Sequence, residues 1–207
     1  MSKQEKLIRL LEISESLVKD TADVYLLFAD LVGSTEYKNM LVKKGLPDYV
    51  WIFRQLTFLG RSADIVKKYE GVVVKTIGDE IFGYFEAITD PQIIMNCAIE
   101  IIQAFDNLNT FTGRNKIEVK VSIDFGSTYN GSIDKSHSFD PIGVPVDRCA
   151  RLIAEATKSE IILSNEFLET LISRSSLKKI KDKYSYQSFE KELKGLGTIK
   201  YHKIVAQ

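Results

Sequence analysis

The chain is poor in the residues that build disulfide frameworks and histidine metal sites. Its 207 residues include two cysteines and two histidines. Cys97 and Cys149 stand far apart and form no CxxC pair, so we expect two reduced, buried thiols in a cytoplasmic protein rather than a disulfide scaffold. With only His137 and His202 available, a zinc site built from histidines is not expected either.

Long apolar runs and an excess of one charge are also missing. The longest apolar stretches, such as residues 24–29, are far shorter than the roughly 20 residues that span a bilayer. The charged N-terminus has no signal-peptide pattern. The 28 Lys and Arg residues balance 28 Asp and Glu residues, so no overall field favours nucleic acid or an anionic membrane. We expect neither as a partner.

What the chain does have is enough apolar sequence for one good core. With 44% hydrophobic residues, it can bury a single domain. Leucines and isoleucines at helical spacing over residues 4–18 predict an amphipathic helix ahead of that domain. We therefore assign residues 1–20 to an N-terminal helix and residues 21–207 to the main domain. The helix either docks on its own domain or, alternatively, makes a dimer contact.

The periodicity along the main domain predicts an α+β sheet with helices mainly over one face, rather than a doubly wound parallel sheet. Residues 140–145 are expected to form a turn. The predicted order is a strand at 24–31, helices at 35–44 and 48–69, a hairpin at 72–77 and 80–87, a helix at 91–108, a hairpin at 117–126 and 127–133, a helix at 146–156, a strand at 160–164, a short helix from 165, and a closing hairpin at 184–193 and 197–206.

Two aspartates at strand ends are the strongest chemical signal. Asp30 lies in FADLVGST (28–35) and Asp79 in KTIGDEIFGYF (75–85), and each is close to a glycine. Mg²⁺ prefers one or two carboxylates together with substrate phosphates. Taken alone, Asp30 is also consistent with an aspartate that caps a strand-to-helix turn, and Gly78-Asp79 is consistent with an ordinary hairpin turn. Together they predict a site for a phosphate-bearing substrate held through divalent cations.

The residues that follow Asp30 suit the phosphate. Gly33, Ser34 and Thr35 begin the next predicted helix. A helix start offers unpaired N–H groups and the positive end of the helix dipole, both of which favour an anion. We therefore expect these three residues to contact substrate phosphates.

Four segments in order resemble the class III nucleotidyl cyclase catalytic domain. They are residues 28–35, 72–85, 139–152 and 193–204, and the similarity covers about residues 22–206. The resemblance implies the ferredoxin-like, palm-type cyclase fold and a head-to-tail homodimer with active sites in its interface. It also implies two divalent cations, Mn²⁺ or Mg²⁺. The implied reaction converts a nucleoside triphosphate to a 3′,5′-cyclic nucleotide and pyrophosphate.

The same resemblance implies roles for individual residues. Asp30 and Asp79 match the two metal-binding aspartates, and the Leu31 carbonyl matches a further ligand. Lys75 matches a base-reading lysine of many adenylate cyclases, and Asp140 matches its partner. Without the resemblance, Lys75 reads as a solvated strand lysine and Asp140 as a turn aspartate.

Three further residues, two of which are positively charged, complete the site that the resemblance implies. Arg151 matches the arginine that stabilises charge on the α-phosphate, although alone it fits a helix-surface ion pair. Lys135 matches a cation that contacts the triphosphate. Asp147 stands where the family usually has an asparagine. Family geometry takes Asp30 and Asp79 from one protomer and the base-reading pair, Asp147 and Arg151 from the other.

Departures from the family pattern bear on turnover and on the base. A carboxylate at Asp147 only accepts hydrogen bonds and adds negative charge, so it would weaken turnover, add a metal ligand, or reflect a differently held ribose or base. Leu196 replaces a phosphate-binding lysine of some members. We expect Tyr49, Trp51 and Phe53 mostly to belong to the core. Alternatively, one of these large side chains leans into the base pocket and makes it smaller.

These departures, the segment GSTEYKN (33–39) and the lack of a recognisable sensor domain resemble stand-alone bacterial pyrimidine cyclases of antiphage defence. Such enzymes make cyclic UMP or cyclic CMP for a separate effector. We therefore predict a pyrimidine substrate, UTP ahead of CTP. Lys75 and Asp140 favour the alternative of ATP, and Asp147 leaves open a degenerate nucleotide-binding module without turnover.

Overall fold

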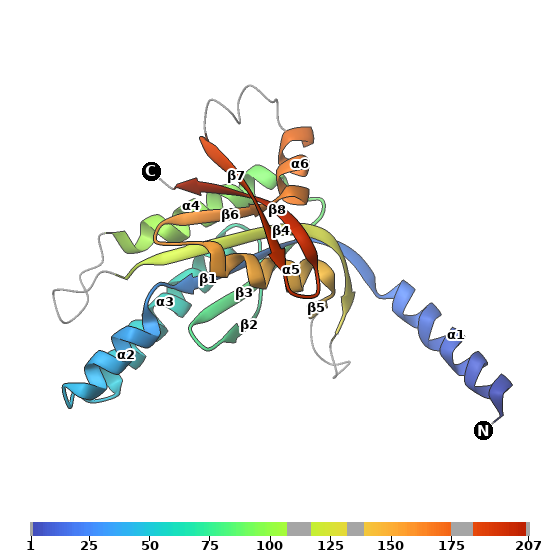
Figure 1. Ribbon diagram of the computed structural model, residues 1–207, viewed down its shortest axis with the longest axis horizontal. Helices are drawn as coiled ribbons and strands as arrows, with labels where there is room; N and C mark the ends of the chain where they lie inside the picture. The colour runs from blue at the N-terminus through green and yellow to red at the C-terminus, as the bar shows by residue number, and fades with distance from the viewer. Residues whose placement is uncertain (1, 107–116, 132–138, 175–183, 206–207) are drawn as a thin grey trace.

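A computed structural model of the chain describes residues 2–106, 117–131, 139–174 and 184–205 (Figure 1). The helices are α1 (Lys3–Lys19), α2 (Ser34–Lys43), α3 (Tyr49–Lys68), α4 (Pro91–Asp106), α5 (Val144–Leu152), the 3-10 helix η1 (Ile153–Glu155) and α6 (Asn165–Arg174). The strands are β1 (Thr21–Leu31), β2 (Val72–Ile77), β3 (Glu80–Glu86), β4 (Val119–Asn130), β5 (Pro141–Ile142), β6 (Glu160–Ser164), β7 (Tyr186–Leu193) and β8 (Gly197–Val205).

The strands form one mixed sheet in the order β2-β3-β1-β4-β6-β8-β7, with β5 paired to the end of β4. Strand β1 pairs antiparallel with both β3 and β4, whereas β4 and β6 run parallel. The continuous apolar run 24–29 is buried along its whole length. A strand covered on both faces needs such a run, which explains why β1 occupies the middle of the sheet.

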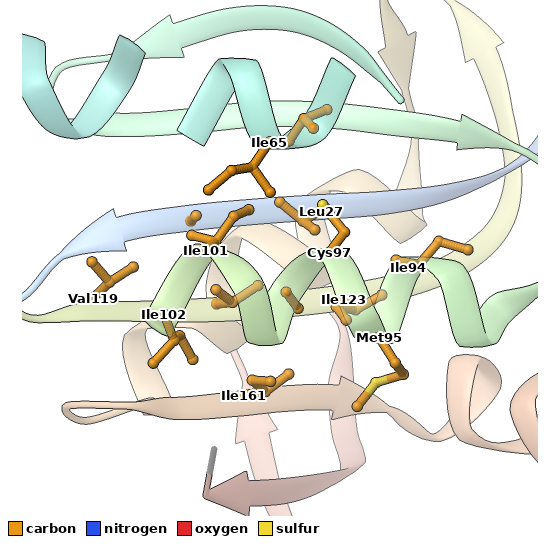
Figure 2. Close-up of a cluster of buried hydrophobic side chains, with 14 of the residues drawn as sticks. Leu27, Ile65, Ile94, Met95, Cys97, Ile101, Ile102, Val119, Ile123 and Ile161 are labelled. Atoms are coloured by element: carbon orange, nitrogen blue, oxygen red, sulfur yellow. The ribbon is translucent and has the colours of Figure 1, made fainter. Parts of the chain in front are cut away.

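Helices cover the two faces of the sheet unequally. The main apolar cluster joins α3, α4 and α6 to one face, and a smaller cluster joins α5 to the other. Figure 2 shows α4 lying over the sheet with Cys97 beside Leu27 of β1, and Ile94, Ile101 and Ile123 of β4 belong to the same buried cluster. Burying each such side chain contributes about 1.5–3 kcal/mol. The prediction of an α+β sheet with helices mainly over one face is confirmed.

The predicted hairpin over residues 117–133 is wrong. Val119–Asn130 is one continuous strand, and Gly126 does not reverse the chain. A Cβ on Gly126 would lie 2.6 Å from Cγ of Pro145, so glycine here permits the close approach of α5 to the sheet. The predicted turn at 140–145 also contains a short strand, β5, which pairs with Tyr129 and Asn130.

The predicted N-terminal helix is present as α1 but does not dock on its own domain. It extends away from the sheet (Figure 1), and its described apolar side chains are all at least half exposed: Leu7, Ile8, Leu10, Leu11 and Ile13. Docking was therefore the wrong expectation, and the dimer contact stays a prediction. Within the described ranges, no helix is both long and apolar enough to cross a membrane.

Two further expectations concern the aromatic residues of α3 and the thiols. Tyr49 and Phe53 are 69% and 57% exposed, so the prediction that they are core is wrong, while Trp51 is half-buried. Both Cys97 and Cys149 are free and buried, as expected.

Candidate active site

Asp30 lies at the end of β1, between an acidic and a basic neighbour. Its register partner on β3 is Glu80 and its partner on β4 is Lys120. Because directly paired residues of antiparallel strands project to the same face, the three side chains form a row across the sheet. The Lys120 Nζ atom lies 3.2 Å from Asp30 Oδ2. The row thus places one ammonium group against two carboxyl groups.

Asp79 lies in the turn between β2 and β3. Gly78 precedes it with a φ of 64°, a conformation that glycine adopts without strain. The Gln55 side chain of α3 donates a hydrogen bond to the Gly78 carbonyl at 2.6 Å. This bond ties the turn to α3 and so fixes the backbone next to Asp79.

The three carboxyl groups interact electrostatically. Burial raises the pKa of Asp30; Lys120 opposes the rise and the charge of Asp79 adds to it. Burial and the neighbouring Asp30 raise the pKa of Glu80 to about 7. Carboxylates crowded in this way favour a positive charge between them. Asp30 and Asp79 therefore act on each other electrostatically at this end of the sheet, and their binding of a shared metal stays a prediction.

The donor set fits a divalent cation that is shared with a substrate. In the described part of the chain, no group of three or more His, Cys, Asp or Glu side chains is arranged to hold a metal alone. Mg²⁺ does not require one, because it commonly binds one or two carboxylates and completes its shell with water and phosphate oxygens. The crowded carboxyl groups of Asp30 and Asp79 match that requirement.

The start of α2 lies beside these aspartates. Gly33 stands before the helix with a φ of 66°, and no side chain caps the first turn. Leu31, Ser34, Thr35 and Asp79 line one pocket of about 340 Å³ between α2, α3 and the β2–β3 turn. The pocket therefore joins two of the predicted metal ligands, Leu31 and Asp79, to Ser34 and Thr35, whereas Asp30 and Gly33 are not part of its lining.

Lys75 and Asp140 form a second group. The Lys75 ammonium contacts both carboxylate oxygens of Asp140, at 2.7 and 3.0 Å. The two side chains are 47% and 29% exposed. Residues 65 positions apart are thus paired, so Asp140 is not an isolated turn aspartate, while Lys75 remains a solvent-exposed strand lysine. Their predicted part in reading a base remains a prediction.

Asp147 and Arg151 lie on α5, and both are exposed. Arg151 donates a hydrogen bond to the Lys194 carbonyl in the β7–β8 turn, which holds its guanidinium near that turn. Leu196, at the same turn, packs against a small apolar cluster. Lys135 lies outside the described residues.

The candidate residues therefore fall into two groups. Asp30 and Asp79 lie at one end of β1 with the start of α2. Lys75 with Asp140, and α5 with its Asp147 and Arg151, make up the other group. In the described ranges, no hydrogen bond or ion pair links one group to the other.

Sequence reasoning missed several residues that build the site. Lys120 and Glu80 reach Asp30 through strand pairing across long separations, which no local pattern reveals. Arg148 was also missed: it forms two hydrogen bonds to the buried Asp124, at 2.7 and 2.8 Å, and so fixes α5 to β4. An arginine within the apolar stretch of a helix was the available signal.

Comparison with known proteins agrees with this geometry. The family model described as the adenylate and guanylate cyclase catalytic domain matches residues 17–205. An adenylate cyclase of Streptomyces coelicolor is 28% identical over 145 residues, which are 70% of this chain and 33% of that protein. The chain thus spans about a third of that relative.

Solved structures share the fold at low identity. The guanylate cyclase domain of RhGC from Catenaria anguillulae, in complex with GTP, has a TM-score of 0.73 at 20% identity, with 90% of this chain and 97% of that chain covered. The adenylyl cyclase CyaB from P. aeruginosa has a TM-score of 0.72 at 20% identity, with 90% and 95% covered.

Proposed function

This chain belongs to the class III family of adenylate and guanylate cyclase catalytic domains, and we propose that it converts a pyrimidine nucleoside triphosphate to its 3′,5′-cyclic monophosphate and pyrophosphate. The observation that carries the proposed chemistry is the approach of Asp30 and Asp79 beside the uncapped start of α2. These groups together suit a polyphosphate bound through metal ions.

In this proposal Asp30, the Leu31 carbonyl and Asp79 hold two divalent cations, Mn²⁺ or Mg²⁺. When bound, such ions lower the pKa of a hydroxyl group and neutralise phosphate charge. The N–H groups of the first turn of α2, with Ser34 and Thr35, orient the terminal phosphates. Lys120, already beside Asp30, adds positive charge at the same place.

The second group of residues acts on the base and on the α-phosphate. The Lys75–Asp140 pair presents both a donor and an acceptor to the edge of a base. Arg151 carries a permanent, planar charge that stabilises the negative charge that develops on the α-phosphate. Asp147, on the same helix, takes part in holding the ribose or the base.

We propose a head-to-tail homodimer, in which each active site combines one group from each protomer. The lack of a hydrogen bond or ion pair between the two groups, within the described residues, supports this arrangement. So do exposed apolar side chains beside the second group: Ile77, Tyr129, Ile142 and Val144 are 51%, 42%, 47% and 59% exposed. In this assignment residues 21–207 form the catalytic domain, and residues 1–20 lie outside it.

Mixing two inactive variants tests the dimer. Asp30→Asn and Arg151→Met each remove one group. If the sites are shared, re-equilibrated equal mixtures contain about half heterodimers with one intact site, which restores about a quarter of the wild-type activity. No recovery, or a monomer in analytical ultracentrifugation at assay concentration, contradicts the shared site.

For the base, we propose UTP ahead of CTP. Tyr49 and Phe53 are bulky, exposed side chains on α3, and a bulky side chain that leans into the base pocket narrows it. Asp147 departs from the purine-cyclase pattern. A narrow pocket rejects a purine by steric exclusion. The product would act in the cytoplasm on a separate effector in antiviral defence. ATP is the second candidate, because the Lys75–Asp140 pair is formed.

The test is turnover of ATP, GTP, CTP and UTP, each with Mn²⁺ or Mg²⁺, with products resolved by mass spectrometry. Asp30→Asn and Asp79→Asn are expected to abolish product. Asp64→Asn, an exposed position on α3, is the matched control. Cyclic UMP or CMP supports the pyrimidine proposal, and cyclic AMP replaces it with an adenylate cyclase. If no product forms under any condition, the proposal of an enzyme is overturned and the chain is a nucleotide-binding module without turnover.

A further inference from the structure

The pocket beside Asp79 contains a buried arginine, Arg54, that has no role in the proposed function. Arg54 projects from α3 and lines this pocket together with Ser34, Thr35 and Lys38. Only 6% of its surface is exposed. A buried guanidinium carries a permanent positive charge that costs several kcal/mol unless it is paired.

Among the described residues, Arg54 has no such ion pair, and its Nε atom is buried without a hydrogen-bond partner. Its guanidinium lies over the Tyr37 ring, whose centroid is 4.7 Å from Cζ. A cation over an aromatic face recovers about 0.5–2 kcal/mol, which is less than the cost of burial. Asp79 and Glu118 attract the charge only from a distance, and burial leaves the pKa of Arg54 lowered.

The surroundings of Arg54 suit an anion. Ser34 and Thr35 lie in the first, uncapped turn of a ten-residue helix, whose dipole is positive at this end. Lys38 also lines the pocket and lies over the Trp51 ring at 4.2 Å. The acidic side chain in the lining is Asp79, and in the proposed function a metal ion neutralises it.

We propose that this pocket binds a phosphate-type anion with Arg54 as its buried cation. The anion is either the terminal phosphate of the bound nucleotide or free pyrophosphate. Arginine suits this task because its planar N–H groups bind phosphate oxygens in pairs. The inference rests on the proposed function for the origin of the anion, but the binding itself is measurable without turnover.

The direct test is calorimetric titration of the protein with inorganic pyrophosphate and tripolyphosphate in the presence of Mg²⁺, so that Asp79 is neutralised. Arg54→Met is expected to weaken binding at least tenfold, and Arg54→Lys to weaken it less because the charge is kept. Arg61→Met is the matched control, since Arg61 lies exposed on the same helix outside the pocket lining, and it should bind as the wild type does. A thermal melt of each variant establishes that it is folded.

Kinetics then separate the two sources of the anion. If Arg54→Met raises KM for the nucleotide and leaves kcat unchanged, the anion is the substrate's terminal phosphate. If KM is unchanged and only inhibition by pyrophosphate is lost, the anion is the free product. Equal pyrophosphate affinity in wild type and Arg54→Met overturns the proposal. If the protein has no turnover but Arg54→Met still weakens pyrophosphate binding, the proposed cyclase activity is refuted and the proposed anion site is supported.

Discussion

Two arginines in this molecule are buried to the same degree yet differ in their surroundings. Arg148 is 8% exposed and Arg54 is 6% exposed. The Arg148 guanidinium donates to both oxygens of Asp124, to Glu166 and to the Phe125 carbonyl. The Nε atom of Arg54 has no hydrogen-bond acceptor in the part of the chain that the structure describes, and the side chain lines a pocket.

The difference separates a structural charge from one that awaits a ligand. A buried charge persists in a fold when its partners are built in, as Asp124 is for Arg148, or when a ligand supplies them. The ion pair of Asp30 and Lys120 is intermediate between these two cases. The side chains are 20% and 17% exposed, respectively, and Lys120 Nζ lies 3.2 Å from Asp30 Oδ2, which is longer than the contacts of Arg148 with Asp124. Substitutions that remove each arginine should therefore have opposite effects on stability and on binding.

The largest effect is expected at Arg148. Arg148→Met leaves the fully buried Asp124 carboxylate without its positively charged partner, which should lower the free energy of unfolding by about 3–5 kcal/mol. Urea denaturation measures the change. The double variant Asp124→Leu with Arg148→Met should recover most of the loss, because no charge then remains buried. A single variant that loses less than about 1 kcal/mol would show that this pair does not hold α5 to the sheet.

The exposed arginine of the same helix should behave differently. Arg151→Met is expected to lower kcat about 10²–10³-fold with little change in the unfolding midpoint, because its partner in the fold is only the Lys194 carbonyl. Arg151→Lys keeps the charge without the paired geometry and should recover part of the rate. Turnover equal to wild type in Arg151→Met would make Arg151 a helix-surface residue.

The comparison also shows how far the sequence alone reaches. The positions of Asp30 and Asp79 at strand ends and the helices between them follow from local apolar patterns and glycines. The row of Glu80, Asp30 and Lys120 does not, because it depends on which strands pair and in which register. A pattern of period two gives the face of a strand but not its neighbour.

Gly126 and Arg54 illustrate two other limits. The hairpin expected from residues 117–126 and 127–133 requires a chain reversal after Gly126, but Gly126 lies within β4 and its close approach to Pro145 is set by tertiary packing. Arg54 was not singled out, since its burial depends on the pocket that α2 and the β2–β3 turn form around it. Tyr49 and Phe53 were expected to be core from their type alone, yet the helix presents them outward.

A smaller effect is expected from removing the unpaired arginine. In the absence of an anion, Arg54→Met should raise the free energy of unfolding by about 1 kcal/mol, because a buried donor without a partner costs roughly that amount. Pyrophosphate at 100 times its dissociation constant should stabilise the wild type by about 2.7 kcal/mol and the variant much less. Thermal melts with and without pyrophosphate measure both changes. A variant less stable than wild type without the anion would indicate that the contact with Tyr37 outweighs the burial cost.

The smallest effect is expected at His202, a buried group whose hydrogen-bond partners carry no charge. Its ring lies 2.9 Å from the Ser188 hydroxyl and 3.4 Å from the Asn165 side-chain oxygen. Burial lowers the pKa of His202 below its ordinary value of about 6.5. Between these two values the unfolded chain binds more protons than the native one, so stability falls as the pH drops below about 6.5.

Replacing His202 by glutamine removes this titration and keeps a polar side chain. Denaturation midpoints from pH 8 to pH 5 should fall more steeply for the wild type than for His202→Gln below pH 6.5, while the two profiles run parallel above it. Parallel profiles over the whole range would mean that the imidazolium is accommodated as well as the imidazole. His202 would then resemble Arg148, whose charge the fold already satisfies, rather than Arg54, whose charge it leaves to a ligand.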